Sequence, residues 1–199
     1  MTQQQPSFTR EAPDDRRQSL IEATARCLAR RGASGVSVRA ICTEAGVSPG
    51  LLRHYFAGVT DAIAEAYRWT GSCVASALDL AVAQAAPHPR ARLLAYLTAS
   101  FRPPIASTDL LASWLGFWAM TRSDPAIAAV HSEIYRDFRQ GVERLIAAYR
   151  PDLPDARLAA VALTALIDGL WLELSLGDAP FTPEEAEVLA ELWLEKLLD

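Results

Sequence analysis

Apolar residues recur every three or four positions along most of the chain, which is the spacing of one face of an α-helix. In residues 14–31 this spacing places Leu20, Cys27 and Leu28 on a common face. Gly32 follows, and glycine is the residue that most often ends a helix. The pattern predicts a first helix with one face buried against partner elements.

Two shorter helices follow, each with a capping serine at its start. Ser37 precedes a helix that we expect to extend to Ala45, and Gly46 supplies the turn after it. Ser48 precedes the next helix, and Pro49 stands at its first position, where a missing backbone N–H is tolerated. The sequence therefore predicts three consecutive helices joined by tight turns.

The third of these helices has two distinct faces. Leu52 and Phe56 are four positions apart and are expected to pack inward. The other face carries Gly50, Arg53 and His54, flanked by Pro49 and Tyr55. An exposed second helix of a helix-turn-helix is the element that enters the DNA major groove. Short helices joined by a glycine also occur in other helical proteins, so the spacing alone leaves DNA and protein partners open.

The rest of the chain predicts an all-α fold, because Ala and Leu dominate and no run of alternating Val, Ile and Thr occurs. Caps and prolines divide it into helices at about residues 60–86, 90–101, 109–122, 126–149, 155–176 and 183–198. The expected organisation is a disordered tail (1–13), a helix-turn-helix DNA-binding domain (14–74, motif 37–56) and a helical effector-binding and dimerisation domain (75–199).

Charge is distributed unevenly along the chain. The formal net charge is −5, but residues 1–70 hold nine Lys and Arg against seven Asp and Glu, a balance of +2. Residues 71–199 hold ten against seventeen, a balance of −7. An anionic partner would therefore meet the first third of the chain.

The three cysteines indicate the compartment. Cys27, Cys42 and Cys73 are odd in number and widely spaced, so we expect buried thiols in a reducing cytoplasm and no metal site. The polar start has no signal-peptide core, and polar residues interrupt the apolar tract 158–176. The sequence predicts a cytoplasmic protein that does not span a membrane.

Catalytic residues do not form a recognisable set. The three histidines, His54, His88 and His131, are scattered, and no phosphate-binding glycine loop occurs. We expect no enzyme activity and no cofactor. Two classes remain: a DNA-binding regulator, or a dimeric helical adaptor or small-molecule binding protein that does not act on DNA.

The segment RQSLIEATARCLARRGASGVSVRAICTEAGVSPGLLRHYF resembles the N-terminal domain of the TetR family of transcriptional regulators. The matching features are the glycine that ends the first helix, the capping Ser37, the AGVS turn, Gly50 and the HYF sequence. The resemblance implies a regulator, most commonly a repressor, that binds a palindromic double-stranded DNA operator as a homodimer and responds to a small-molecule effector.

The resemblance also implies roles for matched positions. Family members commonly contact phosphates or bases at the positions of Ser37, Arg39, Ser48, His54 and Tyr55, and their backbone approaches DNA at Gly50. Two positions depart from the family pattern. Pro49 stands where the family often has Lys or Thr, so a side-chain contact is missing. Val59 stands where a Lys often begins the fourth helix, so a phosphate contact is missing. Arg53 is less usual at its position, and we expect it to compensate.

The last two helices are expected to form the dimer interface. The helix from residue 155 is apolar nearly all round, so it needs cover on two sides. In the resembled family the last two helices of each subunit build a four-helix interface. The candidate interface residues are Leu163, Leu166, Leu170, Leu189, Leu192 and Trp193.

Two aromatic segments are candidates for the effector site. SWLGFWAM and ALIDGLWLE resemble corresponding segments of the choline-responsive branch of the family, which represses glycine-betaine synthesis. Aromatic faces attract a quaternary ammonium ion, and a carboxylate balances its charge. The candidates are Trp114, Phe117, Trp118, Asp168 and Trp171, with Tyr135, Phe138 and Glu173 as weaker ones. An aromatic stripe at helical spacing is also typical of core packing, and that alternative stays open.

Overall fold

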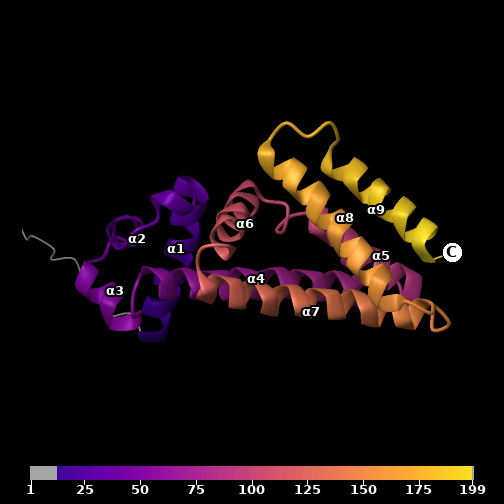
Figure 1. The fold of residues 1–199 in the computed structure, drawn as a ribbon, viewed down its shortest axis with the longest axis horizontal. Helices are drawn as coiled ribbons and strands as arrows, with labels where there is room; N and C mark the ends of the chain where they lie inside the picture. Colours follow the sequence, from indigo (N-terminus) through magenta and orange to yellow (C-terminus); the bar gives the residue numbers. More distant parts are fainter. Residues whose placement is uncertain (1–12, 199) are drawn as a thin grey trace, which may run out of the picture.

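The computed structural model describes residues 13–198, and within them the chain is all-helical, with nine α-helices, one 3₁₀ turn and no strand. The molecule is elongated, with α1 to α3 at one end and the remaining helices extending from them (Figure 1). The predicted all-α class is confirmed. The expected disordered tail (1–13) lies outside the described residues, except for Pro13, which begins α1.

The N-terminal helices begin and end close to the predicted positions. Helix α1 covers Pro13–Gly35, but its backbone leaves the helical conformation at Gly32, with φ 65° and ψ 178°, so the predicted helix stop is a kink. Helix α2 covers Val38–Ala45 and ends at Gly46, which has a left-handed φ of 66°. Helix α3 covers Pro49–Tyr55.

A compact apolar core holds these three helices together. The predicted inner face of α1 is buried, with Leu20, Cys27 and Leu28 at 0% exposure. Leu52 of α3 is also fully buried and Phe56, directly after α3, is 2% exposed. Because α3 turns these two side chains inward, its opposite face is left in solvent.

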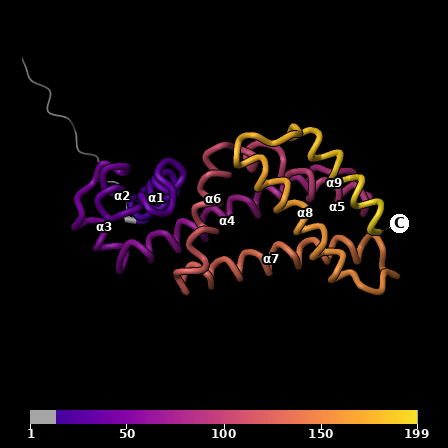
Figure 2. The backbone as a smooth tube through the Cα atoms, turned by 45° about the horizontal axis from the view of Figure 1, so that its top comes forward, coloured from indigo at the N-terminus to yellow at the C-terminus, as the bar shows by residue number. Residues whose placement is uncertain are grey.

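Two long helices form the axis of the molecule. Helix α4 (Val59–Gln84) leaves the N-terminal bundle and packs against α7 (Pro125–Tyr149) along the long axis (Figure 1). The predicted domain boundary at residue 74 falls inside α4, so one continuous helix joins the DNA-facing end to the rest. Figure 2 shows the same arrangement from a second direction.

The other helices cover this axis. They are α5 (Pro89–Thr98) with a 3₁₀ turn (Ala99–Phe101), α6 (Thr108–Thr121), α8 (Ala156–Leu176) and α9 (Pro183–Leu198). Helix α6 lies nearest the N-terminal bundle, and α5, α8 and α9 lie toward the far end (Figure 1). Helix α6 has its most extensive packing against α1, while α8 packs on α6, α7 and α9. Helix α6 therefore touches both the N-terminal bundle and the C-terminal helices.

Close packing between α6 and α1 depends on Gly116, and this gives a stability prediction. A Cβ added at Gly116 would lie 2.6 Å from Cγ of Leu28, a buried branch point that has no room to move. We expect Gly116→Ala to lower the free energy of unfolding by about 1 to 3 kcal/mol, as overpacking does. Urea unfolding measures it.

Gly71→Ala is the matched comparison for this variant. Its Cβ would meet Cδ1 of Ile134 at 2.8 Å, and that atom is the end of a flexible, half-buried side chain. Gly71→Ala should therefore cost less than Gly116→Ala. If Gly116→Ala and the parent chain unfolded at the same urea concentration, α6 and α1 would accommodate the added methyl group at no cost, and the close packing would not matter for stability.

The apolar helix α8 and the three cysteines bear on two expectations from the sequence. Helix α8 is the one helix of the described chain that is long and apolar enough to cross a membrane by length and composition, and 39% of its most apolar 18-residue segment is buried in the protomer.

Cys27 and Cys42 are buried as predicted, whereas Cys73 is exposed. The expectation for Cys73 was wrong because its side chain lies on the outer face of α4.

Candidate functional site

The exposed face of α3 and its turn carries the predicted DNA-contacting side chains. Ser48, Pro49, Gly50, Arg53 and His54 are exposed, and Tyr55 is half-buried. Ser37 and Arg39, at the start of α2, are exposed as well. Arg53, His54 and Tyr55 lie in the last turn of the short helix α3, and the other positions lie at the starts of α2 and α3. The fold thus gathers all eight predicted positions on two neighbouring helices at one end of the molecule: Ser37, Arg39, Ser48, Pro49, Gly50, Arg53, His54 and Tyr55.

Both serines act as helix caps. The Ser37 hydroxyl accepts a hydrogen bond from the backbone N–H of Ala40 at 3.2 Å, and the Ser48 hydroxyl accepts one from Leu51 at 3.4 Å. Each hydroxyl keeps its own proton for another acceptor. At Gly50 a Cβ would meet only the Ser48 hydroxyl, at 3.8 Å, so the backbone there is open to close approach.

An ion-pair chain runs from this end of the molecule toward the C-terminal helices. The guanidinium of Arg17 on α1 lies 5.3 Å from the ring centre of Phe56 and pairs with Glu65 on α4. Glu65 also accepts a hydrogen bond from Arg68 at 2.7 Å. The two arginines lower the pKa of Glu65, with the bond to Arg17 as the largest cause.

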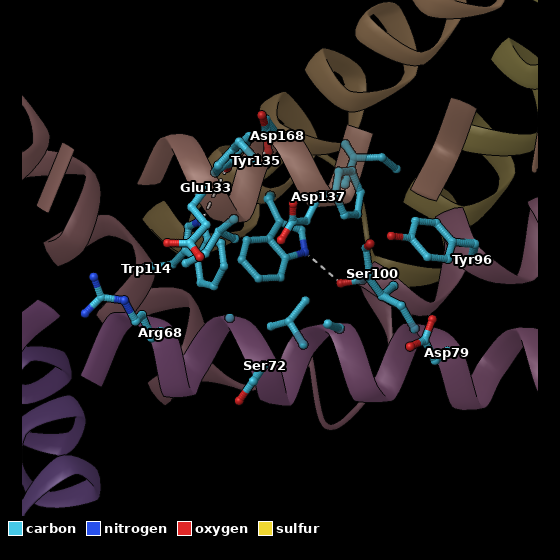
Figure 3. Close-up of a pocket in the computed structure, with 18 of the residues that line it drawn as sticks. Arg68, Ser72, Asp79, Tyr96, Ser100, Trp114, Glu133, Tyr135, Asp137 and Asp168 are labelled. Carbon is cyan, nitrogen blue, oxygen red and sulfur yellow. Dashed lines mark hydrogen bonds between the residues drawn. The ribbon is translucent and has the colours of Figure 1, made fainter. Parts of the chain in front are cut away.

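Arg68 lies at the edge of a cavity of about 440 Å³ between α4 and α7, closed by α5, α6 and α8 (Figure 3). Arg68 and Asp79 lie eleven residues apart on α4, so the cavity extends for about 16 Å along that helix. Its lining holds four carboxylates and two guanidiniums: Asp79, Glu133, Asp137, Asp168, Arg68 and Arg144. The cavity therefore favours a cationic ligand.

Three aromatic side chains meet at one part of this cavity. The rings of Trp114 and Trp171 are nearly perpendicular, at 83°, with centres 5.5 Å apart. The indole N–H of Trp114 donates to the Tyr135 hydroxyl at 3.3 Å. The indole N–H of Trp171 donates to the carbonyl oxygen of Ser100 at 2.7 Å. Both indoles are thereby fixed in orientation, and we call Trp114, Trp171 and Tyr135 the aromatic corner.

Asp168 adds a carboxylate to the aromatic corner. The Tyr135 hydroxyl donates a hydrogen bond to its Oδ1 at 2.9 Å. Burial raises the pKa of Asp168 to about 6, against the lowering effects of the Tyr135 hydrogen bond and of the Arg139 charge. Burial, followed by the charge of Asp168, raises the pKa of Tyr135. The carboxylate is thus ionised but poorly solvated at neutral pH, which is the state that a bound cation stabilises.

Two of the five predicted ligand residues lie outside this cavity. Phe117 is fully buried and stacks on Tyr67, with ring centres 4.2 Å apart, so it is core packing. Trp118 does not line this cavity, although it lies next to the aromatic corner, with its ring centre 6.4 Å from that of Tyr135; its indole N–H has no hydrogen-bond partner in the described part of the chain. The helical repeat placed both aromatics on α6, but only Trp114 faces the cavity.

The weaker candidates for ligand binding also fall into two groups, inside and outside the cavity. Tyr135 and Phe138 of α7 line the cavity, whereas Glu173 is exposed outside it. Sequence reasoning missed Tyr96, which is 7% exposed and also lines the cavity. Its signal was weak, because Tyr96 stands among small and aliphatic residues far from the two aromatic segments.

The predicted interface residues fall into two groups. Leu163 and Leu170 are 0% and 9% exposed, so they pack inside the protomer and offer no free surface, which corrects the prediction for them. Leu166 and Leu189 are half-buried, while Leu192 and Trp193 are 42% and 44% exposed. Further exposed apolar side chains of α8 and α9 were missed: Leu158, Val161, Leu172, Leu176 and Val188.

No group of three or more His, Cys, Asp or Glu side chains that could hold a metal ion occurs in the described residues. His131 is half-buried beside the cavity wall, with Nδ1 2.9 Å from the Tyr67 hydroxyl. Burial, with a smaller effect of Arg139, lowers the pKa of His131. This arrangement has no nucleophile and general base aligned on the cavity.

An exposed helix-turn-helix, joined by one long helix to a domain with an acidic, aromatic-lined cavity, is the architecture of a ligand-responsive DNA-binding regulator. The sequence profile of the bacterial regulatory proteins of the tetR family matches residues 20–66. The profile of the BetI-type transcriptional repressor C-terminal domain matches residues 89–199. The chain therefore belongs to the TetR family of transcriptional regulators, with a C-terminal domain of the BetI type.

Individual relatives agree with this assignment. An HTH-type transcriptional regulator BetI from Burkholderia thailandensis is 34% identical over 186 residues, covering 92% of this chain and 93% of the relative. A transcriptional regulator of known structure from Pseudomonas aeruginosa PAO1 is 42% identical, with a TM-score of 0.85 and coverage of 98% and 96%. A regulator from Saccharomonospora viridis, solved in complex with choline, shares the fold at 23% identity, with a TM-score of 0.81 and coverage of 92% and 95%. The helical adaptor that does not act on DNA is not supported by these relatives.

Proposed function

We propose that the protein is a homodimeric repressor that binds a palindromic operator through α3 of each subunit and releases it when a quaternary ammonium compound, choline, occupies the cavity. The observation that carries this proposal is the Asp168 carboxylate set beside the aromatic corner inside an acidic cavity. The relative that was solved with choline adds support.

The chemistry of this site suits a permanent cation that cannot donate hydrogen bonds. A trimethylammonium group spreads its charge over methyl groups, so it gains from aromatic faces while a carboxylate compensates its charge. Trp114, Trp171 and Tyr135 supply the faces and Asp168 the charge. A primary ammonium ion would instead lose hydrogen bonds to water that this apolar corner does not replace.

Dimerisation is proposed to involve the exposed apolar side chains of α8 and α9. Such side chains are costly on a monomer when they lie together. Leu192 and Trp193 of α9 lie on the outer surface with Leu172 of α8, and the half-buried Leu166 and Leu189 adjoin them. A pair of subunits joined here would hold two α3 helices for successive major grooves, about 34 Å apart.

The DNA contacts are proposed to come from the eight exposed or half-exposed positions of α2 and α3. Arg39 and Arg53 are the cations among them, so phosphate contacts are few and the salt dependence of binding is modest. His54 and Tyr55, whose rings meet edge to face at 5.0 Å, form a rigid pair on this surface.

Coupling between the two sites is proposed to pass through α6 and α4. Helix α6 contributes Trp114 to the cavity and Gly116 to the contact with Leu28 of α1. On α4, Glu65 joins Arg68 at the cavity to Arg17 beside Phe56. A ligand that moves α6 or α4 by a small distance would therefore change the position of α3 and its fit to the operator.

The protein is proposed to act in the cytoplasm.

The proposal predicts two linked measurements on the purified protein. Choline should quench tryptophan fluorescence saturably, because Trp114 and Trp171 line the cavity, and it should release operator DNA in a gel shift over the same concentration range. Arg53→Ala should weaken operator binding by about 1 to 3 kcal/mol, if the contact is to a base edge, without changing the choline titration.

The operator for this experiment is selected from genomic fragments bound by the protein. Tetramethylammonium and a neutral isostere of choline serve as positive and negative ligand controls. The proposal would be rejected if neutral isosteres quenched as well as choline, or if millimolar choline left both fluorescence and operator affinity unchanged.

A further inference from the structure

Tyr96 of α5 carries a hydroxyl that the aromatic corner does not use. The side chain is 7% exposed and lines the cavity, and Figure 3 shows its hydroxyl directed into the cavity. No other group of the described chain forms a hydrogen bond with this hydroxyl. The hydroxyl therefore faces the cavity as a free hydrogen-bond donor and acceptor, and it can bind a polar group of a ligand.

The surrounding residues hold Tyr96 in place. A Cβ at Gly141 of α7 would lie 2.6 Å from the Tyr96 oxygen, so only glycine at this position leaves room for the hydroxyl. The ring of Phe138 lies 5.4 Å from the Tyr96 ring and packs against it. The direction of the hydroxyl is therefore fixed before a ligand arrives.

Tyr96 is also close to the aromatic corner. It precedes Ser100 by four residues, about one helical turn or 6 Å. Ser100 accepts the hydrogen bond from Trp171 at 2.7 Å, and all three residues line the cavity. The Tyr96 hydroxyl and the aromatic corner therefore line one cavity, where a single ligand with a cationic group and a second polar group can reach both.

Resting on the proposed function, we propose that Tyr96 forms a second subsite that donates a hydrogen bond to an uncharged hydroxyl of the effector. The cavity would then select quaternary ammonium alcohols over analogues that carry an alkyl group or a carboxylate at that end.

The charges near Tyr96 decide between a hydroxyl and a carboxylate. Asp79 and Arg144 both line this end of the cavity. Burial and then Asp79 raise the pKa of Tyr96, while Arg144 has the smaller, opposite effect. Tyr96 therefore keeps its proton as a donor. The cavity wall carries four carboxylates against two guanidiniums, so a carboxylate on the ligand is disfavoured.

The test compares three probes of similar size: choline, propyltrimethylammonium, which lacks the hydroxyl, and glycine betaine, which carries a carboxylate. Calorimetric titration of the wild-type dimer should give choline roughly a three- to tenfold lower Kd than propyltrimethylammonium, the range of one hydrogen bond. Glycine betaine should be the weakest. In Tyr96→Phe the preference for choline should fall to about one, because propyltrimethylammonium keeps its affinity.

Two further variants separate the possible failures. Asp168→Asn should weaken choline and propyltrimethylammonium alike and leave their ratio unchanged. Asp79→Asn changes an exposed residue and should narrow the gap between choline and glycine betaine. If both cations bind the wild type equally, or Tyr96→Phe keeps the preference for choline, the Tyr96 subsite is wrong while the proposed function stands. If neither cation binds the wild type, the proposed function itself fails.

Discussion

Leu192→Glu should convert the protein to a folded monomer and weaken operator binding by about a hundredfold or more. Leu192 is 42% exposed on α9, so glutamate is accommodated in the isolated protomer but would be buried without a partner in the proposed interface. A monomer also loses the gain of two linked half-site contacts, which amounts to roughly 10² to 10⁴ in affinity. Analytical ultracentrifugation and operator titration measure the two effects.

Ala83→Glu is the control for this variant. Ala83 is exposed on α4, away from α8 and α9, so the same new charge there should leave both the mass and the operator affinity unchanged. Circular dichroism of Leu192→Glu should show native helix content. If Leu192→Glu sediments as a dimer, the interface lies elsewhere. If the wild-type protein sediments as a monomer at micromolar concentration, the proposed dimer does not form.

Asp168→Asn should stabilise the free protein while weakening choline binding by roughly thirtyfold or more, the range for losing a partner of a buried charge. Burial raises the pKa of Asp168 from 3.8 to about 6. The native state therefore binds more protons than the unfolded state between these values, and its stability falls as pH rises through this window. Above it, the ionised carboxylate costs on the order of 2 kcal/mol, a cost that asparagine removes.

Thermal unfolding at pH 7.5 should thus give a higher Tm for Asp168→Asn, and the difference should vanish below about pH 4. Choline affinity of the wild type should fall about tenfold between pH 8 and pH 5, as Asp168 takes up its proton. Tyr135, Arg139 and His131 also lie near this site and can contribute to the pH dependence of choline binding. The same pH titration of Asp168→Asn measures their contribution, because the asparagine side chain does not ionise. A wild-type affinity that is independent of pH, or a lower Tm for the variant, would contradict this role of Asp168.

Much of the N-terminal end was predictable because its determinants are local. Ser37 and Ser48 cap helices through bonds within three residues, and Gly46 adopts the left-handed turn that ends α2. The inward direction of Leu52 and Phe56 follows from helical spacing alone. Since the exposed face of a short helix is what remains after its core face is assigned, the candidate DNA surface was found from sequence.

The candidate cavity was predictable only in part. Of the predicted residues, Trp114, Trp171 and Asp168 line its wall, whereas Phe117 stacks in the core and Trp118 lies beside the aromatic corner without lining the cavity. Aromatic residues at helical spacing identify a helix that is buried, without showing which neighbour lies against each side. Tyr96 and the α4 wall are distant in sequence from the aromatic segments and had no local signal.

The sequence by itself determined the helices, their caps, the inward stripe of each, the class of the fold and the unusual apolarity of α8, because these depend on contacts within a few residues. Only the tertiary structure decided which faces meet. The crossing of α4, α5, α7 and α8 places Tyr96, Trp171 and Asp168 around one cavity. The packing of α8 against its neighbours α6, α7 and α9 buries Leu163 and Leu170, while Leu192 stays exposed on α9. A helical repeat fixes direction around its own axis, whereas a site depends on how several axes cross.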